Sequence, residues 1–237
     1  MLGVSCNFNH MQKLLFSFIV FSLLSCSAKS QSATKEKSDV LFKESVPLFM
    51  DLLMMQKPDL DSSKIHRDSI NTLANILIAK YLEIYYLDSI NNKSTEYYIA
   101  DCYRFNKQYE KAIYWYQHEI KGSTNENNIK SSFEFIGQSF LYLGELDSAM
   151  YYIKTASFLS EKSENINQVL PNIIACAKII LKYPDPKLSE ILKAKGIKTC
   201  QYSIEILKRL EPLTKSKTFF SAEPIMTTIA NEEKKCN

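Results

Sequence analysis

Two stretches of the chain, residues 95–128 and 131–162, carry the same pattern of apolar and small residues, and this repetition restricts the fold more than any other feature. The paired positions, all at one constant offset, are Ile99 with Ile136, Ala100 with Gly137, Tyr103 with Phe140, Tyr109 with Leu146, Ala112 with Ala149, and Tyr116 with Ile153. Within each copy the apolar residues recur at helical spacing. A unit of this kind buries its apolar face only against its neighbours, so the units must stack.

Each copy is predicted to be a pair of helices joined by a short turn. Ala100 and Gly137 let the paired helices approach closely, because a larger side chain would push the helix axes apart. Residues 104–108 and 141–145 have the length of helix–helix turns.

This pattern resembles the tetratricopeptide repeat (TPR), a family in which pairs of antiparallel helices stack into a solenoid. The resemblance implies an all-α fold, an antiparallel helix-pair solenoid of TPR type with about three to four pairs. The chain departs from the family in three ways. The closing proline is missing from both copies, the offset slightly exceeds the usual repeat length of about 34 residues, and Glu119 stands where the second copy has Ala156.

Two repeats rarely make a stable solenoid, so we expect the flanking segments to be helical as well, giving a TPR-like domain over residues 40–214. Helical apolar patterns extend over residues 40–56, 68–87, 166–183, 188–194 and 199–210. Proline ends these patterns near Pro58, Pro184 and Pro212, because proline cannot continue a helix. Residues 215–237 lack such a pattern and are predicted to be a loosely structured tail.

The N-terminal segment has the layout of a secretory signal peptide. Lys13 precedes the short apolar run of residues 14–24, which is too short to span a bilayer comfortably, and small residues follow. We therefore expect residues 1–25 to be removed on export. Met11 is an alternative start to Met1, and either choice preserves this layout.

The signal segment ends in Leu-Leu-Ser-Cys at residues 23–26, which resembles the lipobox of bacterial lipoproteins. The resemblance implies cleavage before Cys26, attachment of acyl chains such as palmitate to its thiol, and anchoring in the cell envelope, at the outer membrane. Residues 26–39 are polar and small, and are predicted to be a flexible tether. A plain signal peptide with a chance cysteine is the alternative.

Four cysteines remain after Cys6 and Cys26, and they are widely spaced. Zinc-ligand spacing is absent, so no metal site is expected. Export permits disulfides, and Cys176 with Cys200 is the pair we would test first. Cys102 lies in an apolar helical pattern and is expected to be a buried free thiol.

The sequence carries no motif of a known catalytic centre, and the prediction is a protein that is not an enzyme and needs no cofactor. His66 and His118 are the histidines left after the signal segment, and neither belongs to a metal or nucleophile motif. The net charge of +3 is not concentrated in a basic run, so nucleic acid is not an expected partner.

In the TPR family the first helix of each pair lines a concave groove. That resemblance predicts a partner-binding groove lined by Tyr97, Asp101, Arg104, Phe105, Glu134, Gln138, Leu141 and Tyr142. Aromatic and arginine side chains of this kind are common in binding hot spots. The alternative is that neighbouring helices or the tail cover these residues.

The predicted function is that of a non-catalytic lipoprotein of the cell envelope, a scaffold that binds another protein or peptide through the groove and the membrane through its lipid anchor. An inhibitor or immunity-type binding protein is one alternative. A glycan- or nutrient-binding lipoprotein is another, because aromatic side chains can stack on sugars.

Overall fold

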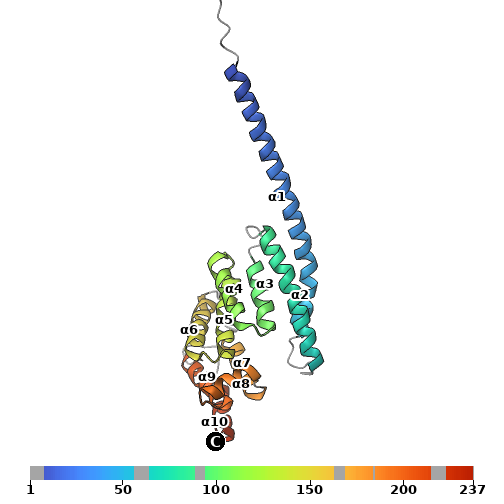
Figure 1. Cartoon of the computed structure of the whole chain (residues 1–237). Coiled ribbons are helices and arrows are strands. Elements are labelled where there is room, and N and C mark those ends of the chain that lie inside the picture. The colour runs from blue at the N-terminus through green and yellow to red at the C-terminus, as the bar shows by residue number, and fades with distance from the viewer. Residues whose placement is uncertain are drawn as a thin grey trace, which may run out of the picture.

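The computed structural model describes residues 8–55, 64–88, 94–162, 169–183, 185–214 and 223–236, and this part of the chain forms helices and no strand (Figure 1). The helices are α1 (Phe8–Met55), α2 (Lys64–Asp88), α3 (Thr95–Phe105), α4 (Tyr109–Gly122), α5 (Glu126–Tyr142), α6 (Leu146–Lys162), α7 (Val169–Lys182), α8 (Pro186–Ala194), α9 (Thr199–Thr214) and α10 (Glu223–Cys236). The prediction of an all-α fold is confirmed for these ranges.

Consecutive helices pack as pairs. Helices α1 and α2, α3 and α4, and α5 and α6 form three such pairs, and the second helix of each pair packs on the first helix of the next segment. Helix α7 packs on α9, and α10 packs on α9 in turn. Figure 1 shows this order as a row that runs from the long α1 to the C-terminal helices.

Gly137 lies where α5 crosses α6, as its place in the repeated pattern predicted. A Cβ atom on Gly137 would meet Ile153 Cγ1 at 2.7 Å and the carbonyl oxygen of Ala149 at 3.3 Å. The matching residue of the α3–α4 pair, Ala100, is fully buried against α4. Small residues at these two positions therefore permit the close approach of the paired helices.

The short helix α8 lies against the turns of the two preceding pairs. Asp185 caps the start of α8 by accepting hydrogen bonds from the backbone N–H groups of Lys187 and Leu188, and its other carboxylate oxygen accepts a hydrogen bond from Lys107 Nζ at 2.6 Å. Gly144, in the turn between α5 and α6, has φ +70°, and its Cβ would lie 3.1 Å from Ile191 Cγ2. Helix α8 thus links the second and third pairs.

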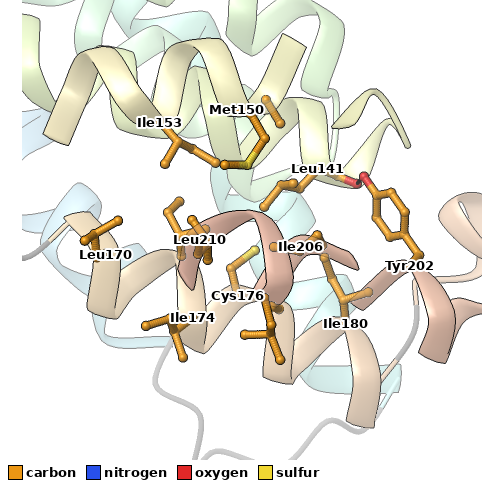
Figure 2. Packing of buried hydrophobic residues seen from close by; sticks show 14 of the residues in the cluster. Leu141, Met150, Ile153, Leu170, Ile174, Cys176, Ile180, Tyr202, Ile206 and Leu210 are labelled. Atoms are coloured by element: carbon orange, nitrogen blue, oxygen red, sulfur yellow. Dashed lines mark hydrogen bonds between the residues drawn. The ribbon is translucent and has the colours of Figure 1, made fainter. Parts of the chain in front are cut away.

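The largest apolar cluster joins α5 and α6 to the C-terminal helices α7, α8, α9 and α10. Figure 2 shows Ile153 and Met150 above Leu210, Ile206 and Cys176 in this cluster, with Tyr202 donating a hydrogen bond to the Leu141 carbonyl at 2.9 Å. Two smaller clusters lie between the α1–α2 pair and α3, and between α3, α4 and α5. The apolar contacts therefore run through the whole row of helices.

The structure differs from the sequence prediction at both ends of the domain. Residues 26–39, predicted to be a flexible tether, are part of α1, and packing begins before residue 40: Ser38 is buried, and Lys37 pairs with Glu83 of α2 at 2.8 Å. The predicted loose tail contains α10, whose Ile229 is buried in the largest apolar cluster. Residues 1–7 and 215–222 lie outside the described residues.

The predicted pairing of Cys176 with Cys200 is wrong. Cys200 is bonded to Cys236, with a Cα–Cα distance of 5.9 Å, and this disulfide joins the start of α9 to the end of α10. Cys176 is a buried free thiol in the apolar cluster, where burial raises its pKa to about 11. Cys102 is also a buried free thiol, as expected.

Candidate interaction surfaces

The predicted groove residues on α3 form a buried polar network. Arg104 donates hydrogen bonds to Asp101 Oδ1 from Nη2 at 2.8 Å and to the Tyr116 hydroxyl from Nε at 3.1 Å. The Tyr116 hydroxyl donates to the same Asp101 oxygen. Asp101 and Tyr116 are almost completely buried, and the Arg104 side chain is 19% exposed. The charge of Arg104 is therefore neutralised inside the protein.

Aromatic rings enclose the same guanidinium group. The Arg104 Cζ atom lies 4.4 Å from the ring centroid of Phe105 and 4.2 Å from that of Phe135 on α5. Tyr97 packs on both Tyr116 and Phe135. Cation–π contact adds to the hydrogen bonds, so Arg104 joins α3, α4 and α5 rather than pointing toward a ligand.

The predicted groove residues on α5 make contacts with α4 and α7. Glu134 Oε1 accepts hydrogen bonds from Asn172 of α7 at 2.8 Å and from Gln138 at 3.0 Å. Burial is the main cause that raises the pKa of Glu134, and the two amide donors oppose that shift. Tyr142 stacks on Tyr109 of α4 with a centroid distance of 4.9 Å.

The prediction of an exposed groove face is therefore wrong for four of its residues. Asp101, Phe105, Glu134 and Leu141 are buried, and Leu141 belongs to the largest apolar cluster. Tyr97, Arg104, Gln138 and Tyr142 are half-buried and engaged with neighbouring side chains. The alternative stated above, that neighbouring helices cover this face, agrees with the structure.

An exposed apolar strip lies instead on α1. It consists of Val46, Met50, Leu53 and Met54, which are between 37% and 53% exposed. We call these four residues the α1 strip. Their spacing places them on one side of a helix, separate from the buried side formed by Ser38, Ser45, Phe49 and Leu52. Helix α1 thus carries two apolar faces, of which one is covered.

The contacts of α1 show which way the α1 strip faces. On one edge of the buried side, Lys37 and Glu44 form ion pairs with α2. On the other edge, Phe42 and Phe49 pack on Tyr98 of α3, with ring centroids 5.6 Å and 5.0 Å away. At about 100° per residue, the strip falls beyond the edge that faces α3 and away from α2.

The sequence carries a signal for the α1 strip within the apolar helical pattern of residues 40–56. Val46 and Leu53 lie on a different side of a helix from Phe49 and Leu52. A helix on the surface of a domain buries one stripe, and these positions are too widely spread around the helix to share one.

Other features of the described ranges bear on a metal site, a membrane span and a reactive thiol. No three His, Cys, Asp or Glu side chains among these residues lie close enough together to hold a metal ion. In the same ranges, no helix has both the length and the apolarity required to cross a bilayer. The free thiols of Cys102 and Cys176 are buried, and burial raises the pKa of both.

The chain has no match among protein-family models, curated proteins or solved structures.

Proposed function

We propose that this chain is a non-catalytic, exported and lipid-anchored scaffold of TPR type that holds a protein partner on the α1 strip. The observation that carries the proposal is the second apolar face of α1. Val46, Met50, Leu53 and Met54 are exposed, whereas the other face of the helix is buried against α2 and α3. A contiguous apolar row of this kind is typical of an interaction site.

The strip also fits the geometry of the family that the sequence resembles. Helix α1 is the first helix of the first pair, and in TPR proteins the first helices line the concave side. The row follows the spacing by which an amphipathic helix is recognised, so the partner segment that fits it is the apolar face of another helix. The buried network around Arg104 joins α3 and α5, the first helices of the next two pairs.

Export is supported by the Cys200–Cys236 disulfide, because disulfides persist mainly in oxidising compartments. The lipid anchor on Cys26 follows from the lipobox resemblance at residues 23–26. Metabolic labelling with a fatty-acid analogue tests it: the wild-type chain should incorporate label, and Cys26→Ala should not. Undiminished label on Cys26→Ala would remove the anchor from the proposal.

The partner site is tested by capture from native membranes with two matched variants. Met50→Lys with Met54→Lys places two charges in the strip, whereas Tyr183→Lys places a charge on an exposed side chain beyond α7. The proposal expects one defined partner to be retained by the wild type and by Tyr183→Lys and lost from the double variant. A partner retained equally by all three proteins would place the interface elsewhere. A purified wild-type chain that dimerises through the strip would replace the foreign partner with a second copy.

A further inference from the structure

Each of α2, α4 and α6, the second helices of the three helix pairs, carries two adjacent aromatic residues. They are Tyr85 and Tyr86 on α2, Tyr114 and Trp115 on α4, and Tyr151 and Tyr152 on α6, and we call these six residues the aromatic surface. One member of each pair, Tyr86, Tyr114 and Tyr151, is between 54% and 79% exposed. The other member is half-buried. Each helix thus presents one exposed ring beside one half-buried ring.

Contacts between the helices fix the three pairs relative to one another. The Tyr85 ring lies 5.1 Å from the Trp115 ring in an edge-to-face arrangement, which joins α2 to α4. Gln117 Nε2 of α4 donates a hydrogen bond to the Tyr152 hydroxyl of α6 at 3.1 Å. Rings held in this way offer a large contact area with little loss of conformational entropy on binding.

The exposed apolar side chains of α4 and α6 are aromatic rather than aliphatic. Among the described residues of these two helices, the large apolar side chains that are exposed are Tyr114, Tyr151 and Phe158. A lipid tail would be bound as well by leucine or isoleucine. Ring faces, which carry partial negative charge, favour a ligand that presents flat, weakly positive C–H faces together with hydroxyl groups, and a sugar ring does both.

The charges beside these rings are positive. Lys111 lies three residues before Tyr114, and Lys154 lies three residues after Tyr151, so each lysine shares a helix face with an exposed tyrosine. Both lysines are exposed, and Lys111 Nζ lies 5.3 Å from the centroid of the Tyr103 ring.

The acidic residues that lie one helical turn before the exposed tyrosines of α4 and α6 are paired with other cations. Glu110 pairs with Lys187 of α8 at 3.0 Å, and Asp147 pairs with Arg209 of α9. The face that carries Lys111 and Lys154 is therefore complementary to an anion.

We propose that the aromatic surface binds an acidic polysaccharide, with sugar rings stacked on Tyr114 and Tyr151 and carboxylate groups of the sugars close to Lys111 and Lys154. Tyr114 and Tyr151 lie on different helices, α4 and α6, which both pack on α5. A ligand that reaches both tyrosines must therefore be an oligomer rather than a single sugar. This site lies on the second helices of the pairs, so it is separate from the α1 strip and does not depend on the partner proposed there.

Titration of the full chain with acidic polysaccharides tests the proposal. The chain has one tryptophan, Trp115, and its ring contacts Tyr85 and Tyr114, so its fluorescence reports on the site. The probes are polygalacturonate, alginate, hyaluronate and heparin, with calorimetry as a second readout. The expected result is saturable binding of at least one of them. The absence of binding by all four, in both readouts, would overturn the proposal.

Variants and matched probes then identify the contacts. Tyr114→Ala with Tyr151→Ala should weaken binding about tenfold or more, whereas Tyr183→Ala, which removes an equally exposed ring elsewhere, should leave it unchanged. Lys111→Gln with Lys154→Gln should weaken binding and reduce its dependence on salt. Methyl-esterified polygalacturonate keeps the sugar rings and loses the charge, so it should bind less tightly than polygalacturonate.

Three results would contradict the proposal. Equal binding of polyglutamate would identify an acidic polypeptide as the ligand, because it supplies carboxylates without sugar rings. Equal binding of phosphatidylglycerol vesicles would identify an anionic membrane surface. Unchanged affinity of the double tyrosine variant would show that the rings do not form the site.

Discussion

At the scale of single residues, the polar groups inside the helix row decide how the pairs are held together. Most of them have partners, as around Arg104, but the Glu119 carboxyl is an exception. Its Oε1 accepts a hydrogen bond from Asn128 at 3.1 Å, and its buried Oε2 has no partner among the described residues. An unpartnered buried carboxyl oxygen destabilises the folded state.

Replacing Glu119 with alanine is expected to raise the free energy of unfolding by about 1 kcal/mol. The third pair already carries Ala156 at the matching position, where it is fully buried. Asn128 loses one of its two side-chain hydrogen bonds in this variant and retains the one that it donates to Ser94. Urea unfolding of Glu119→Ala at neutral pH measures the change. A loss of stability of about 1 kcal/mol or more would mean that the carboxyl has a stabilising partner.

The half-buried Glu96 and the buried Glu134 are expected to make stability depend on pH. Burial raises the pKa of both above the ordinary glutamate value, so the folded protein holds their protons more tightly than the unfolded chain does. Their stabilising contribution is complete below the unfolded pKa of about 4.3 and is lost as pH rises through the raised folded values.

Urea midpoints measured from about pH 4 to pH 7 test this sign by comparison with Glu134→Gln, which still accepts a hydrogen bond but cannot titrate. The wild type should lose stability relative to the variant as pH rises across that window. A difference between the two proteins that does not change with pH would contradict a raised pKa at Glu134.

At the scale of helices, the crossing of α5 and α6 sets how closely the third pair packs. Gly137 lies at this crossing, and two backbone atoms of α6, the Ala149 carbonyl oxygen and the Ile153 amide nitrogen, would each be 3.3 Å from an added Cβ. At the matching position of the α3–α4 pair, Ala100 is fully buried, so that crossing accommodates a methyl group. The two crossings are therefore similar but not identical.

Gly137→Ala is expected to destabilise the protein by about 1 kcal/mol, because overpacking outweighs the gain in helix propensity that alanine brings. Gly122→Ala is the matched control: it lies in α4, and a Cβ there would meet nothing within 4 Å. That control should be neutral or stabilising by up to about 1 kcal/mol. Thermal or urea unfolding of the two variants checks the difference, and a stabilising Gly137→Ala would exclude a close crossing.

At the scale of the whole molecule, the two ends of the helix row differ in how much apolar surface they leave exposed. At the C-terminal end, α10 covers α9 and the Cys200–Cys236 disulfide holds it there. At the other end, α1 leaves the four apolar side chains of the α1 strip exposed, and Val40 is exposed as well. Terminal units of stacked helical proteins normally present a polar outer face, so an exposed apolar face at one end favours a bound partner there.

Much of this arrangement was predictable from the sequence, because residues 95–162 carry a repeated pattern with small residues at the helix crossings. The helix pairs and the place of Gly137 follow from that pattern. The groove face was not predictable, because its exposure depends on contacts distant in sequence, such as Asn172 with Glu134. The pairing of Cys200 with Cys236 depends on how α10 docks, and residues 215–237 have no pattern from which to infer that docking.

The central claim of this account is that the α1 strip is covered by a helix of another protein, and site-specific photo-crosslinking from Met50 tests it most directly. A photoreactive amino acid replaces Met50 in one variant and exposed Asn75 on α2 in the control. The account predicts that irradiation of intact cells yields one discrete adduct from position 50, that the adduct maps to a helical segment of a different protein, and that position 75 does not yield it. No adduct from position 50, or the same adduct from both positions, would contradict the account.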